Sequence, residues 1–139
     1  FSCGKVLNMV SIYETGKGWN KYWGIRDRVA YLDCTNGYNS LSLPEGSYYI
    51  SSLLGKAFLH IPEEEAFKFK IEAHKINYIG NINLATQYAS EHKRGPTTVK
   101  NYSLTPHLTD KRSAAEEYFK SAKPSLSEQY SFTTNLAYK

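Results

Sequence analysis

Several side chains in this chain are of types that perform catalysis or bind metals, but their spacing does not bring them together. The four histidines lie in separate segments, and none has a second ligand type at the short spacing typical of zinc sites. They are His60, His74, His92 and His107. The acidic run 63–65 offers carboxylates, yet adjacent acids in a polar loop normally stay solvated. No GxSxG sequence presents a serine nucleophile, and TGKGWNK lacks the spacing of a phosphate-binding loop. The sequence therefore predicts no catalytic residue, metal or cofactor, and a protein that is not an enzyme.

The stretch with the most binding chemistry is TGKGWNKYWGIRDR, residues 15–28. Exposed aromatic side chains beside cations can stack on sugars or bases, sit among lipid headgroups, or form a protein-binding hot spot. The alternative is that a tryptophan folds back over one end of the core, since tryptophans are highly buried on average. The candidate binding residues are Trp19, Lys21, Tyr22, Trp23 and Arg26.

The elements that must position these residues are mostly β-strands, because apolar and polar residues alternate along much of the chain. In residues 67–73, Phe67, Phe69 and Ile71 share one face while lysines occupy the other. The expected strands cover residues 4–14, 28–34, 47–53, 57–61, 67–73, about 76–84, 98–104 and 130–138.

The stretch from 67 to 84 predicts a hairpin with a two-residue turn at His74-Lys75. A histidine in such a turn must either adopt positive φ or force a different geometry. Gly80 predicts a bulge or a close backbone approach. The alternation weakens after Gln87, so a loop around Gly95 is expected before the next strand.

One helix is expected in KRSAAEEYFKSA, with Asp110 as its cap and Pro124 as its end. Its apolar stripe comprises Ala115, Tyr118, Phe119 and Ala122. Together these elements predict a mainly β fold: a two-sheet antiparallel β-sandwich of seven or eight strands, with one short helix near the C-terminus. A closed barrel is the alternative. The length of 139 residues matches a single domain, 1–139.

The net charge of +4 does not by itself indicate nucleic acid as a partner. Basic residues are spread through the chain and interleaved with glutamates, whereas nucleic-acid binders usually concentrate them on one stripe. No stretch approaches the length of apolar sequence that a membrane-spanning helix needs. We expect neither a nucleic-acid partner nor a small-molecule substrate.

The two cysteines, Cys3 and Cys34, bear on the compartment. A disulfide between them would tie down the N-terminal segment and imply an oxidising compartment. The sequence FSCG also resembles the end of a bacterial lipoprotein signal, in which Cys3 would carry the lipid and could not pair. Two buried free thiols are the third reading. We favour the disulfide, and both it and lipidation predict a location outside the cytosol.

Two motifs, LPEGSYYI and FKIEAHKINYIGNINL, resemble a signature of small bacterial envelope β-sandwich proteins of unknown function, many of them lipoproteins. The likeness covers about 40 residues, and the chain departs from it at His74, where that family favours glycine. The resemblance implies a transthyretin-like or immunoglobulin-like sandwich without catalytic activity, located in the periplasm or at the outer membrane.

Two functions of different classes follow. The first is a structural or interaction domain whose partners are other envelope proteins, such as a subunit of a secretion-system outer-membrane complex, with membrane contact through a lipid anchor. The second is a module that binds polysaccharide or anionic lipid through residues 15–28.

Overall fold

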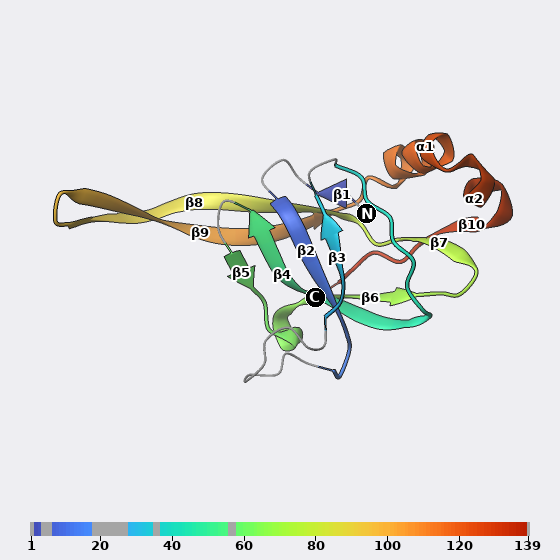
Figure 1. Cartoon of the computed structure of the whole chain (residues 1–139), viewed down its shortest axis with the longest axis horizontal. Helices are drawn as coiled ribbons and strands as arrows, with labels where there is room; N and C mark the ends of the chain where they lie inside the picture. Colours follow the sequence, from blue (N-terminus) through green and yellow to red (C-terminus); the bar gives the residue numbers. More distant parts are fainter. Residues whose placement is uncertain (1, 4–6, 18–27, 35–36, 56–57, 139) are drawn as a thin grey trace.

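The computed structural model describes residues 2–3, 7–17, 28–34, 37–55 and 58–138 (Figure 1). These residues form ten strands and two α-helices. The fold is mainly β, with antiparallel sheets arranged as a β-sandwich, as the sequence predicts. The strand count exceeds the expected seven or eight for two reasons. The two-residue β1 is too short for alternation to reveal it, and the strand expected over about 76–84 divides around Gly80 into β7 and β8.

The largest sheet has five strands and supplies most of the core. Its central strand β4 (Gly46–Gly55) pairs antiparallel with β2 (Leu7–Glu14) on one side. On its other side, β4 pairs through its first half with β6 (Phe67–Ile71) and through its second half with β5 (Phe58–His60). Strand β3 (Arg28–Asp33) adds to β2 at the outer edge.

A second sheet is built on a long hairpin. Strand β8 (Asn81–Arg94) pairs antiparallel with β9 (Thr97–Thr109), and the two-residue β1 (Ser2–Cys3) adds in parallel at the start of β8. The far part of this hairpin leaves the body of the molecule as a two-stranded ribbon (Figure 1). We call residues 87–101 the arm.

The predicted loop after Gln87 is therefore wrong, because β8 continues to Arg94 and the turn occupies only the tip. Every residue of the arm is exposed except the half-buried Val99. A strand that is solvated on both faces has no reason to alternate apolar with polar residues, so periodicity could not reveal it.

The predicted hairpin between residues 67 and 84 is also wrong in its pairing. Strand β6 pairs with β4, whereas β7 (Lys75–Tyr78) pairs in parallel with β10 (Ser131–Thr134). The chain does turn at His74, which adopts positive φ of 55°. The side chain of Asn77 bonds the backbone of Glu72 and Lys75, so it occupies groups that a hairpin ladder would use.

The core lies between the five-stranded sheet and the segment that runs from β7 into β8. Its largest fully buried side chains include Tyr49, Tyr78 and Phe69. The predicted alternation of β6 is confirmed, since Phe67 and Phe69 are buried while Lys70 is exposed. The many tyrosines are thus partly explained by a core that uses aromatic residues on pleated surfaces.

Two short helices cover one end of the sandwich (Figure 1). Helix α1 (Arg112–Ala122) begins one residue later than predicted, so its N-cap is Lys111 rather than Asp110. The Asp110 carboxylate still accepts a hydrogen bond from the Arg112 amide at 2.8 Å. Pro124 ends α1 but also occupies the first turn of a second helix, α2 (Pro124–Gln129), which the sequence analysis did not expect. Proline is well tolerated there because its missing N–H has no partner in a first helical turn.

Candidate functional site

A cavity of about 560 Å³ lies between the five-stranded sheet and the C-terminal helices. That volume falls within the range of about 300–1,000 Å³ common for small-molecule sites. Its floor includes Ile12, Leu32 and Phe69 from the sheet, and its roof includes Phe119 of α1 and Leu126 of α2. The cavity is thus bounded by apolar side chains from segments far apart in the sequence.

Helices α1 and α2 are not tightly packed against the sheet. Ala115 is the buried residue of α1, and α2 has none. Tyr118 remains 45% exposed and Leu126 39% exposed, although both line the cavity. Tyr118 is held by stacking on Tyr38, with ring centroids 4.6 Å apart. The predicted apolar stripe of α1 therefore faces the cavity more than it fills a core, and Ala122 is exposed.

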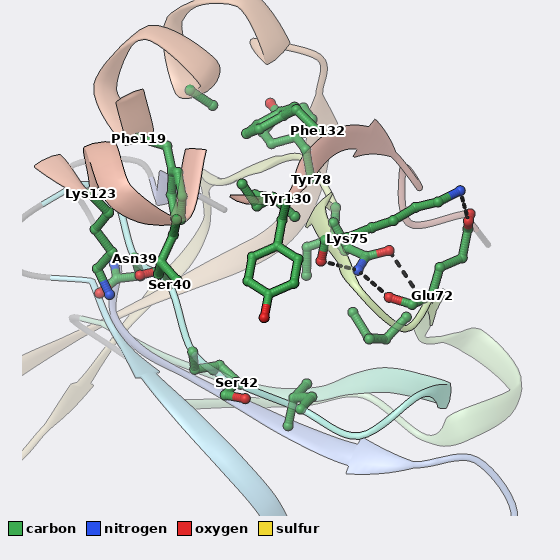
Figure 2. A pocket seen from close by; sticks show the side chains of 18 of the residues that line it. Asn39, Ser40, Ser42, Glu72, Lys75, Tyr78, Phe119, Lys123, Tyr130 and Phe132 are labelled. Atoms are coloured by element: carbon green, nitrogen blue, oxygen red, sulfur yellow. Dashed lines mark hydrogen bonds and ion pairs between the residues drawn. The ribbon is translucent and has the colours of Figure 1, made fainter. Parts of the chain in front are cut away.

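One wall of the cavity is a network of polar side chains around Asn77 (Figure 2). Its Oδ1 accepts from the Glu72 amide at 3.0 Å and from Nδ2 of Asn135 at 2.7 Å. Its Nδ2 donates to the carbonyls of Glu72 and Lys75. This network joins the β6–β7 turn to the residue that follows β10, so it fixes the wall to the C-terminal segment.

The carboxylate of Glu72 is the charged member of the network. The hydrogen bond from Lys75 lowers its pKa most, a second hydrogen bond from Asn135 lowers it further, and the charge of Lys75 adds a smaller decrease. Glu72 is therefore ionised near neutral pH and already partnered. It does not have the raised pKa of a general acid that must hold its proton at pH 7.

Tyr78 connects the cavity wall to the start of α1. Its buried hydroxyl accepts a hydrogen bond from the Lys111 amide at 2.7 Å, and its ring stacks on Phe132. Burial raises the pKa of this phenol, while the hydrogen bond from Lys111 opposes the rise. Tyr78 therefore helps to position α1, because its hydroxyl is hydrogen-bonded to the amide that precedes the helix.

Other polar groups face the cavity more openly. Figure 2 shows the phenol of Tyr130 pointing into the space above Ser42. Lys123, between the two helices, lies beside Asn39 and Ser40 at one end of the cavity (Figure 2). Lys123 has no acidic partner among the residues that the structure describes. The cavity therefore combines apolar walls with one unneutralised cation.

The binding residues expected from sequence are in the segment 15–28, most of which the structure does not describe. Trp19, Lys21, Tyr22, Trp23 and Arg26 all lie outside the described residues. The start of their segment is anchored, since the Gly16 amide donates to Glu63 Oε1 at 3.1 Å and the Thr15 amide donates to Ser47 O. The binding role of residues 15–28 stays a hypothesis.

The histidines lie in different parts of the fold. His60 lies 3.4 Å from the Ser51 hydroxyl, His74 forms the β6–β7 turn, and His92 lies on the arm. Within the described ranges, no group of three or more His, Cys, Asp or Glu side chains could hold a metal ion.

The cysteines are described only in part. Cys34 follows β3 and is buried in the core, and the described part of the chain contains no free cysteine. The backbone of Cys3 lies in β1, which pairs with β8 rather than with β3, and its side chain is outside the description. The Cys3–Cys34 disulfide and the alternative lipidation of Cys3 both stay predictions.

The chain matches no protein-family model, and neither a curated protein nor a solved structure was found to be similar to it. Across the described residues, no helix combines the length and apolar character that a membrane crossing requires. The resemblance to envelope proteins therefore stays an expectation from two motifs.

The cavity could not be read from the sequence. Tyr38, Lys123 and Tyr130 come from segments separated by as many as 92 positions, counted from 38 to 130. The single usable signal was the apolar stripe of α1, which carries too few residues to seal a helix onto a sheet. That signal predicts a helix packed on the sheets but not the cavity beneath it.

Proposed function

We propose that this protein is a non-enzymatic interaction domain of the bacterial envelope, located in the periplasm or associated with the outer membrane. It would form part of a larger envelope assembly, such as a secretion-system outer-membrane complex. The motif resemblance and the predicted disulfide support the compartment. The single observation that carries the interaction role is the arm, which projects from the body (Figure 1).

The arm buries too few side chains to contribute much to the stability of the domain. A two-stranded hairpin alone is marginally stable in water, because it has no third layer or strand against which to bury side chains. From Asn83 onward, β8 pairs with β9 alone among the described strands. A partner that covered one face of the arm would supply the missing burial.

The charge of the arm indicates the chemistry of that partner. It carries Lys93, Arg94 and Lys100 against Glu91 alone. The exposed Tyr88 adds an aromatic ring of the kind that dominates protein interfaces. The lysines and Pro96 at the tip oppose indiscriminate pairing of the strand edges. We therefore expect side-chain contacts with an acidic protein surface, weakened by salt.

A photo-crosslinking experiment tests this role. A photoreactive amino acid replaces Thr98 on the arm in the full-length protein, expressed in its native cells, and crosslinks are compared with and without Lys93→Glu plus Arg94→Glu. We expect discrete adducts with envelope proteins that the charge reversal removes. A photoreactive group at the exposed Lys70 of β6 is the matched control on the body.

Two results would contradict the proposal. One is an arm that gives the same adducts as position 70, or that keeps its adducts after charge reversal. The other is cell fractionation that places the native protein in the cytosol.

A further inference from the structure

We propose that the cavity beneath the C-terminal helices binds an amphiphile with an aliphatic chain and one anionic head group, a carboxylate or a phosphate. This site is separate from the arm and does not depend on the interaction role. The inference rests on the apolar walls, the incomplete seating of the helices, and the placement of Lys123.

The apolar walls favour an aliphatic chain. Side chains of the sheet form one wall, and Phe119 and Leu126 of the helices face them across the cavity. Apolar surface left in contact with water costs roughly 25 cal/mol per Å² relative to burial. Phe69 of the sheet is only 2% exposed, so water meets the apolar lining chiefly at Leu41, which is 37% exposed, and at the helices. A chain lying in the cavity would remove water from Leu41 and from the helical side.

The helices are attached in a way that leaves room for such a chain. Three contacts anchor the helical side of the cavity. Tyr78 bonds the start of α1, and Tyr38 stacks on Tyr118. The Phe132 ring of β10 packs edge-on against Phe119, with ring centroids 6.4 Å apart. Between those anchors, Ala115 is the buried side chain of α1. A ligand would cover part of the exposed surface of Leu126 and Tyr118.

The position of Lys123 selects an anionic head group. At the opposite wall, Glu72 is already neutralised by Lys75. Lys123 has no acidic partner in the described part of the chain, and it lies at one end of the cavity beside Asn39 and Ser40 (Figure 2). Figure 2 shows the hydroxyls of Tyr130 and Ser42 nearer the middle of the cavity, where each can donate to an oxygen of a ligand. A cationic head group would meet no free carboxylate there.

The test is displacement of a fluorescent dansyl fatty acid from the full chain by four ligands that share one alkyl chain. The ligands are dodecanoate, dodecyl phosphate, dodecanol and dodecyltrimethylammonium. We expect saturable binding of the probe, with both anions displacing it better than the alcohol and the alcohol better than the cation. The order of dodecanoate and dodecyl phosphate shows whether a free fatty acid or a phospholipid-type head group fits better.

Two variants locate the binding. Lys123→Ala is expected to weaken both anions by roughly two- to fivefold, the effect of one exposed ion pair, and to leave dodecanol unchanged. Lys120→Ala is the matched control, because Lys120 lies in the last turn of α1, three residues before Lys123, but pairs with Glu116 and does not line the cavity. Ser42→Trp would place an indole below Tyr130, and we expect it to abolish binding of all four ligands.

The proposal is overturned if the probe shows no saturable binding, or if a folded Ser42→Trp protein binds as well as the original. It is also overturned if Lys123→Ala and Lys120→Ala change the preference for anions over dodecanol equally. Circular dichroism establishes folding, and the Lys123→Ala comparison decides the matter even if Ser42→Trp does not fold.

Discussion

The side chain of Asn77 holds the peptide groups of Glu72 at both sides: its Oδ1 accepts from the Glu72 amide at 3.0 Å, and its Nδ2 donates to the Glu72 carbonyl at 2.9 Å. This amide takes the place of a backbone partner across the β6–β7 turn. It allows β6 and β7 to join different sheets while the backbone groups between them keep hydrogen-bond partners.

Removing that amide should destabilise the domain. Asn77→Ala leaves the partly buried amide and carbonyl of Glu72 without their partner, and a buried polar group left unpaired costs about 1–3 kcal/mol. The Lys75 carbonyl is exposed and can bond water instead. We expect the free energy of unfolding in urea to fall by at least that amount. Asn101→Ala on the exposed arm is the control and should change it by roughly 0.5 kcal/mol or less. Equal effects of the two substitutions would contradict the bridging role of Asn77.

The ion pair of Glu72 should make stability depend on acidic pH. The pKa of Glu72 is lowered in the folded protein by Lys75 and then Asn135, so the folded state binds fewer protons than the unfolded state in that range. Its stabilising contribution is present above the usual value of 4.5 and is lost as the pH falls through the lower folded pKa. Denaturation curves between neutral and acidic pH should show a flatter dependence for Glu72→Gln. Glu64→Gln, an exposed residue of η1 (Glu63–Glu65), should follow the original protein.

Gly80 should not tolerate a side chain. It has φ of +120°, and an added Cβ would lie 3.0 Å from the Leu108 side chain. Gly80→Ala therefore combines backbone strain with a steric clash, and we expect a loss of roughly 1–3 kcal/mol. Gly37 has φ of +81°, but a Cβ added there would meet no atom within 4 Å. Gly37→Ala therefore measures the backbone strain without the clash. Thermal unfolding that is equally affected in both variants would show that Leu108 moves aside freely.

The cysteine prediction can be tested by mass spectrometry of protein purified from its native cells. We expect no alkylation of Cys3 or Cys34 before reduction, and a loss of about 2–4 kcal/mol in stability after it. The double variant Cys3→Ser, Cys34→Ala should match the reduced protein. Two thiols alkylated in the folded, unreduced protein would refute the disulfide, and a lipid mass on Cys3 would support the alternative anchor.

Substituting the two tryptophans of residues 15–28 tests whether they bind a ligand or pack in the core. If Trp19 and Trp23 bind polysaccharide or anionic lipid, Trp19→Ala and Trp23→Ala should abolish retention on polysaccharide resin or anionic vesicles. The melting temperature should then stay nearly unchanged. A fall of several degrees with unchanged retention would instead assign these side chains to the core. Trp23→Phe is the conservative control for lost aromatic area.

The sequence by itself determined the mainly β class, most strand positions and the start of α1. These features follow from local rules: side chains alternate across a strand buried on one face, and the Asp110 carboxylate binds the Arg112 amide at the start of a helix. The expected close approach at Gly80 was also local, since glycine inside an alternating pattern signals a position where a Cβ would not fit.

Only the tertiary structure decided which strands pair, how far β8 extends and where a cavity lies. The pairing of β7 with β10 joins residues more than 50 positions apart, for example Lys75 and Ser131, and no local pattern encodes it. The arm is solvated on both faces, so burial leaves no period in its sequence. The cavity is the space that α1 and α2 fail to fill, and such a space depends on how distant elements pack rather than on the residues of any one element.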